Sequence, residues 1–176
     1  MITNRHVAAE NGQQPDSIQV QMADQKVLLT ADVVNVAPAT ATAPDVAVLK
    51  IRSYSGPHVA HIDWADSSVR QGAPGVLIGF PAGLRMALDN EAVARTTVSA
   101  GTFMSSREDE IRFQGFTVGG SSGSPVFNSD GALVALHRAG MVDAEGHLAV
   151  GMGIEVPIRK LIPFLPADAK TELGLH

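Results

Sequence analysis

The sequence VGGSSGSPVFNSDG, residues 118–131, contains four serines, four glycines and one proline, and an apolar run follows it. A segment of this kind is either a glycine-rich turn or a loop that presents one serine as a nucleophile. It is not a phosphate-binding loop, because no lysine follows its last glycine and no helix is predicted after it. The chemistry of its serines therefore depends on what the rest of the chain supplies.

Two of these serines match a nucleophile pattern. Ser121 fits the G-x-S-x-G elbow of α/β hydrolases, but that elbow runs from a strand into a helix, whereas Pro125 and a β-type PVF follow here. Ser122 is the second candidate. A serine hydroxyl needs a base, usually histidine, and a group that orients the base. His6 in TNRHV and Asp45 in PDVAVLKI precede Ser122, in the order His, Asp, Ser.

The sequence around these motifs predicts an all-β protein. Short runs of alternating or β-branched residues are separated by turn residues at regular spacing, which is typical of sandwiches and barrels. Only the tail from Pro157 is predicted to be helical, with Pro163 limiting its length. The predicted strands are 17–23, 26–38, 46–51, 75–81, 92–105, 110–116, 132–140 and 148–157.

Composition narrows the classes of partner and site. The net charge is −5 with no basic run, which disfavours a nucleic acid or an anionic membrane surface as partner. The chain has no cysteine, so disulfides and cysteine-ligated zinc are excluded. His58 and His61 form an H-x-x-H that matches no zinc pattern, so no metal site is predicted.

Two features of the sequence bear on location. No apolar stretch approaches the length of a membrane span, and the N-terminus lacks a basic start followed by an apolar core. If Met1 is the true start, a cytoplasmic location is expected. If an N-terminal segment is missing, a secreted or periplasmic location is expected instead.

The motifs TNRHV, PDVAVLKI and GSSGSPVF, in this order, resemble the trypsin-like serine proteases of the chymotrypsin fold, nearest to the bacterial glutamyl-endopeptidase and high-temperature-requirement branches. The likeness covers nearly the whole chain. It implies two antiparallel, six-stranded Greek-key barrels followed by a short C-terminal helix. The implied units are a remnant of the first barrel at 1–55 with the histidine and aspartate, a connection at 56–74, the second barrel at 75–157 with the serine, and the C-terminal helix and tail at 158–176.

The first barrel is expected to be incomplete at its N-terminus. Members of the family have three strands before the catalytic histidine, whereas here the histidine is residue 6. A misassigned start, a truncation, or strands supplied by another chain would each explain the difference. Half a barrel leaves unpaired strand edges and an open apolar face.

The resemblance assigns a role to each residue of the motifs. Ser122 would attack the scissile carbonyl of a peptide or protein substrate, His6 would take and return the proton, and Asp45 would orient the imidazole. The backbone N–H groups of Gly120 and Ser122 would form the oxyanion hole. This mechanism requires no cofactor and no metal.

A substrate preference is also implied. Thr117, five residues before Ser122, and His137, fifteen residues after it, occupy the positions that bind the P1 carboxylate in glutamyl endopeptidases. Both side chains can donate hydrogen bonds to a carboxylate, so Glu or Asp is expected at P1. The alternative is that His137 is a satisfied strand residue and Thr117 a plain β-former.

Other functions stay open at this point. An inactive or incomplete protease-fold domain that binds peptides or proteins has no chemical need for the triad, but it is compatible with a missing segment. An esterase would use the same triad for the same acyl-transfer chemistry.

Overall fold

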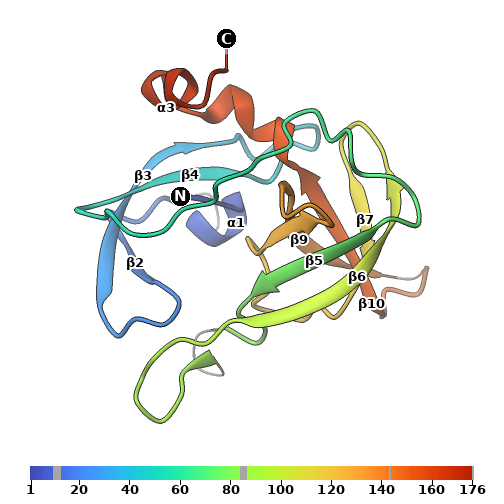
Figure 1. The fold of residues 1–176 in the computed structure, drawn as a ribbon, viewed down its shortest axis with the longest axis horizontal. Helices are drawn as coiled ribbons and strands as arrows, with labels where there is room; N and C mark the ends of the chain where they lie inside the picture. Colours follow the sequence, from blue (N-terminus) through green and yellow to red (C-terminus); the bar gives the residue numbers. More distant parts are fainter. Residues whose placement is uncertain (10–12, 84–86, 143, 176) are drawn as a thin grey trace.

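The computed structural model describes residues 1–9, 13–83, 87–142 and 144–175. The chain forms an open, four-stranded antiparallel sheet beside a closed six-stranded barrel, seen at the left and right of Figure 1. Strands dominate, and the helical segments are short. The expected all-β architecture with an incomplete first barrel and a short C-terminal helix is therefore confirmed.

The open sheet comes from the N-terminal part of the chain, in the order β1-β4-β3-β2. Its apolar side chains gather on one face, where Val20, Ala31 and Leu49 pack with Ala8. Ala8 belongs to α1, a short helix that the sequence patterns did not predict. The elements are β1 (Ile2–Thr3), α1 (Arg5–Ala8), β2 (Ile18–Gln21), β3 (Leu28–Val36) and β4 (Ala47–Ile51).

The barrel closes in the order β10-β7-β6-β5-β8-β9. Its interior is apolar, and the rings of Phe103 and Phe113 meet in a tilted pair with centroids 5.5 Å apart. Closure means that each of these six described strands is paired on both sides. The strands are β5 (Pro74–Gly79), β6 (Thr97–Ser106), β7 (Ile111–Gln114), β8 (Pro125–Asn128), β9 (Leu133–Val142) and β10 (Leu148–Pro157).

A second apolar cluster joins the sheet to the barrel. Ala37 and Val46 from the sheet half pack with Leu136 and Val156 of the barrel and with Leu161. Leu161 belongs to the 3-10 helix η1 (Ile158–Phe164), which is followed by α3 (Ala167–Glu172). The two halves therefore pack against each other through this shared apolar cluster, which is separate from the cluster inside the barrel and the one on the sheet. Among the described residues, no helix is long and apolar enough to cross a membrane.

Two of the predicted boundaries differ most from the structure. Pro157 ends β10 in extended conformation and does not start a helix, and the tail forms η1 and α3 separated by Leu165 and Pro166. A residue before proline is disfavoured in the α region, which explains the break at Leu165. The strand predicted at 92–105 begins at Thr97, because the preceding residues form a loop that is closed by side-chain hydrogen bonds.

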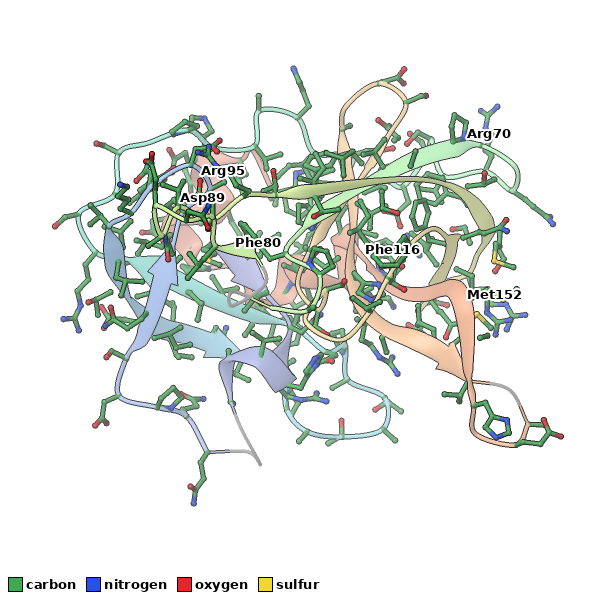
Figure 2. All side chains as sticks on the ribbon, turned by 90° about the horizontal axis from the view of Figure 1, so that it is seen from below. Arg70, Phe80, Asp89, Arg95, Phe116 and Met152 are labelled. Carbon is green, nitrogen blue, oxygen red and sulfur yellow. The ribbon has the colours of Figure 1, made fainter. Side chains whose placement is uncertain are left out.

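That loop belongs to a long excursion between β5 and β6, residues 80–96, of which 84–86 are outside the described residues. Figure 2 shows Asp89 and Arg95 of the excursion side by side, and Arg95 Nε donates to Asp89 Oδ2 over 2.9 Å. Asp24, in the β2–β3 turn, accepts a second bond from Arg95. The excursion from the barrel is thereby attached to the open sheet.

Candidate active site

His6 and Asp45 form a close hydrogen-bonded pair. His6 Nδ1 lies 2.6 Å from Asp45 Oδ2, and the His6 backbone N–H donates to Asp45 Oδ1 over 3.1 Å. The aspartate side chain is only 11% exposed, whereas that of His6 is 47% exposed. Burial opposes the charge on Asp45, but the hydrogen bonds from His6 outweigh it and hold the pKa of Asp45 below its ordinary value.

The residues just before His6 position it. Asn4 is fully buried, and its Nδ2 donates to the backbone carbonyl of Asp45 over 3.0 Å. Arg5 Nη1 donates to the carbonyl of Pro38 over 2.8 Å. Because β1 pairs with the start of β4, α1 begins beside the residues that lead into β4. Asn4 and His6 thus hold the TNRH segment against Asp45, and Arg5 bonds it to the loop that precedes Asp45.

Thr3 connects this pair to the serine loop. Gly123 has a positive φ of 84°, and a Cβ at this position would lie 2.5 Å from Thr3 Oγ1. Thr3 is three residues before His6, and Gly123 directly follows Ser122. The absence of a side chain at Gly123 therefore lets the open sheet approach the loop that carries Ser122.

The serine loop is shaped by tight backbone contacts. Gly120 has φ 93°, and a Cβ there would lie 2.3 Å from the backbone nitrogen of Gly83. The carbonyl of Gly119 accepts a hydrogen bond from the Ala82 N–H over 2.8 Å. In a trans peptide the N–H points opposite to the C=O, so the Gly120 N–H is directed away from Ala82. Within the described residues, neither Gly120 N–H nor Ser122 N–H donates to a protein acceptor.

Ser122 itself has a partner on β9. Its hydroxyl donates to the backbone carbonyl of Arg138 over 3.2 Å. No hydrogen bond joins Ser122 to His6 among the described residues. Of the three predicted triad members, the structure brings His6 and Asp45 into direct contact. The loop that carries the third, Ser122, approaches the same N-terminal segment at Gly123, which lies against Thr3.

The two residues expected at the P1 subsite have different surroundings. Thr117 is half-buried in the segment between β7 and the serine loop. A hydrogen bond from the Phe116 N–H to Ser99 Oγ, 2.7 Å long, fixes this segment next to β6. His137 is 2% exposed, and its Nδ1 lies 3.1 Å from each carboxylate oxygen of Glu155. Burial raises the pKa of Glu155, and the hydrogen bond and charge of His137 oppose that rise.

The remaining histidine motif lies apart from these contacts. His58 and His61 line a shallow cavity together with Phe127, in the segment between the sheet and the barrel. Across the described ranges, no group of three or more histidine, cysteine or acidic side chains could hold a metal ion.

Comparison with known sequences identifies the family. The sequence model of the trypsin-like peptidase domain matches residues 1–136. The chain belongs to the trypsin-like peptidase family. Its recognition from the three motifs is confirmed, and peptides or proteins are the substrates of this family of serine proteases.

Two curated relatives of this trypsin-like peptidase are found. Exfoliative toxin A of Staphylococcus aureus is 34% identical over 89 residues, which cover 49% of this chain and 29% of the toxin. A probable periplasmic serine endoprotease DegP-like protein of Chlamydia pneumoniae is 26% identical over 178 residues, covering 99% of this chain and 33% of that protein. The chain therefore spans about a third of the length of these relatives.

Sequence reasoning missed four residues of this trypsin-like peptidase that bear on the site. Thr3, Asn4 and Arg5 directly precede His6, so their position in the motif was the available signal. Glu155 had only a weak signal, an acidic residue inside an otherwise apolar predicted strand. Its pairing with His137 depends on the register between β9 and β10.

Proposed function

We propose that this trypsin-like peptidase is a serine endopeptidase that works through His6, Asp45 and Ser122 and forms an acyl-enzyme. The observation that carries the proposal is the His6–Asp45 pair, with Nδ1 and Oδ2 2.6 Å apart. With Nδ1–H directed to the carboxylate, the neutral ring has its lone pair on Nε2, which is the atom a general base needs.

The proposed reaction follows from these groups. The Ser122 hydroxyl leaves the Arg138 carbonyl by rotation about its χ1 bond and gives its proton to His6 Nε2 as Oγ bonds to the scissile carbon. The tetrahedral oxyanion is stabilised by the N–H groups of Gly120 and Ser122, which have no other protein acceptor in the described part of the chain. His6 then protonates the leaving amine, and water releases the acyl group by the same steps in reverse.

The proposal includes an acidic residue at P1. Thr117 and His137 lie before and after Ser122 in the chain, and both side chains can donate a hydrogen bond to a carboxylate. Backbone bonds support this placement of His137, since its N–H donates to the Ser124 carbonyl over 2.8 Å and its carbonyl accepts from the Gly123 N–H over 2.9 Å. His137 is thereby held next to the nucleophile loop.

A fluorophosphonate probe tests the nucleophile. Wild type is expected to be labelled, and Ser122→Ala is expected to lose labelling completely while remaining folded. Ser129→Ala, in the exposed turn after β8, is the matched control and should label like wild type. Equal labelling of wild type and Ser122→Ala, or none in folded wild type, would reject the active-enzyme proposal.

The P1 preference needs a separate experiment. Fluorogenic peptides that differ only at P1 should be cleaved fastest after Glu, more slowly after Asp, and slowest after Leu or Arg. Turnover after Leu or Arg that equals turnover after Glu would reject the acidic preference and leave the nucleophile assignment intact.

One observation favours a second function. Among the described residues the Ser122 hydroxyl bonds to the Arg138 carbonyl and not to His6, an arrangement that is compatible with a protease-fold domain that binds peptides without cleaving them. Tight binding of a peptide to folded wild type, with no labelling by the probe and no cleavage, would support this alternative.

A further inference from the structure

Glu155 and His137 form a buried pair in the barrel. The two residues are directly opposite each other on β10 and β9, and they are 0% and 2% exposed. Both oxygens of the carboxylate lie 3.1 Å from the same ring nitrogen, Nδ1. A carboxylate with no exposed surface is costly unless it is paired, so the pairing needs an explanation beyond packing.

The barrel wall makes room for this pair. At Gly153 on β10, a Cβ would lie 2.4 Å from Glu155 Oε1 and 3.2 Å from the His137 ring atoms Nδ1 and Cε1. Any side chain at this position would therefore displace the carboxylate from the imidazole. Gly153 does not have a positive φ, so backbone conformation does not require a glycine at this position. The close approach of the Glu155 carboxylate and the His137 ring explains it instead.

The pair is also next to the proposed nucleophile. The backbone of His137 is bonded in both directions to Gly123 and Ser124, and the hydroxyl of Ser122 reaches the carbonyl of Arg138. Neighbouring strands lie about 4.8 Å apart, so His137 is one strand spacing from the loop of Ser122. Since Glu155 occupies Nδ1, Nε2 is the ring nitrogen left for a substrate group.

The number of protons on the pair determines whether His137 Nε2 is a hydrogen-bond donor or an acceptor. A carboxylate beside a neutral imidazole leaves one uncompensated negative charge in an enclosed site, which is disfavoured. The pair without net charge has one more proton, either on the imidazole or on the carboxyl group. In the first arrangement both ring nitrogens carry hydrogen, and in the second the carboxyl O–H donates to Nδ1 and the ring hydrogen is on Nε2. Both arrangements present Nε2–H as a donor.

We propose that Glu155 is a positioning residue for substrate specificity. By pairing with His137 it keeps the Nε2–H of that ring directed at the P1 side chain as a hydrogen-bond donor, while the pair as a whole carries no net charge. This inference rests on the proposed function and deepens its substrate class. The subsite then selects a hydrogen-bond acceptor at the end of a side chain as long as that of Glu or Gln more strongly than it selects negative charge. P1 Glu and P1 Gln should both be cleaved, with kcat/KM within about tenfold of each other, and P1 Leu should be much poorer.

Kinetics of Glu155→Leu test the role. Leucine has no polar atom to hold the His137 ring or to share a proton with Nδ1, so kcat/KM for P1 Glu is expected to fall about tenfold, mainly through a higher KM, with P1 Leu changed less than about twofold. Glu172→Leu makes the same chemical change on the exposed face of α3 and should leave all substrates unchanged. An equal loss on P1 Glu and P1 Leu, or no loss on either, would overturn the proposal.

A second measurement does not depend on a Glu155 variant or on catalysis. In folded Ser122→Ala, ¹⁵N–¹H correlation spectra of the histidine rings should show His137 Nε2 carrying hydrogen, and an unprotonated Nε2 would overturn the proposal. These outcomes can be distinguished from a failure of the proposed endopeptidase function. Absence of Ser122-dependent cleavage rejects the endopeptidase, whereas the state of Nε2 and peptide binding to Ser122→Ala still decide the role of Glu155.

Discussion

The carboxylate of Asp45 accepts hydrogen bonds from both the ring and the backbone N–H of His6. In Asp45→Asn the amide can still bond the ring, but it no longer selects the tautomer with hydrogen on Nδ1 or stabilises the protonated ring. We expect kcat to fall on the order of 10³–10⁴-fold with little change in KM, the magnitude that the general triad template gives. Steady-state kinetics measure this, and a loss below tenfold would contradict the orienting role.

The same contact predicts how stability depends on pH. The pKa of Asp45 is lowered in the folded state from its ordinary value of 3.8. A lowered carboxyl pKa stabilises the folded state fully above the unfolded-state value, and this stabilisation is lost as the pH falls through the folded-state value. Urea unfolding should show wild type more stable than Asp45→Asn at pH 5, with the difference shrinking below about pH 3.8. A constant difference down to about pH 2.5 would contradict this.

Gly120 offers a test of the loop that holds the oxyanion donors. In Gly120→Ala the new Cβ would meet the Gly83 backbone nitrogen at 2.3 Å, so the loop must shift. We expect kcat to fall on the order of 100-fold, the typical effect of losing one such donor.

Gly131→Ala is the control for backbone strain in that experiment. Gly131 also has a positive φ, 77°, but no atom lies within 4 Å of its ideal Cβ. It should lose roughly 1–2 kcal/mol of stability with kcat unchanged. Equal kcat values for the two variants would show that the loop tolerates the shift.

At the scale of elements, the excursion at 80–96 attaches the barrel to the β2–β3 turn. Asp89 organises it, since its Oδ1 accepts the N–H groups of Glu91 and Val93 over 2.9 and 3.0 Å. Gln21 Nε2 donates to the Ala92 carbonyl over 2.9 Å, and the Asp24 N–H donates to the Ala94 carbonyl over 3.0 Å. The excursion also carries the Ala82 and Gly83 backbone against which the serine loop packs.

We expect Asp89→Ala to lower the urea midpoint clearly, because it removes the acceptor for two backbone N–H groups and for Arg95. Glu91→Ala removes an exposed carboxylate from the same loop, where Glu91 contacts only Lys26 among the ion pairs of the described residues. Exposed ion pairs contribute little, so this control should match wild type. Equal midpoints for the two variants would show that the loop is not organised by Asp89.

At the scale of the whole molecule, a shared apolar cluster joins the open sheet to the barrel. Leu161 is completely buried in this cluster, and Trp64 packs against it. Leu161→Ala is expected to cost about 2–5 kcal/mol of unfolding free energy, with Trp64 fluorescence and far-ultraviolet circular dichroism changing at the same urea concentration. Two separated transitions would mean that the halves unfold independently. An Ala substitution at exposed Leu173 should leave the midpoint unchanged.

Local patterns predicted much of the fold. The strands at 46–51, 110–116 and 148–157 were found because β-branched residues between turn residues are a local property. The motif order also identified the family, since residue types and spacing suffice for that. The helix α1 was missed because four residues carry too little periodicity, and the start of β6 was missed because the Asp89 hydrogen bonds, and not propensity, end the preceding loop.

The candidate site divides in the same way. Sequence alone was enough to name His6, Asp45 and Ser122 as candidates, because their chemistry is visible in the residue types. Only the tertiary structure brought Asp45 to within 2.6 Å of His6, Thr3 against Gly123, and Glu155 onto His137. These contacts join distant parts of the chain through strand register and close backbone approach. No pattern within a single segment contains that information.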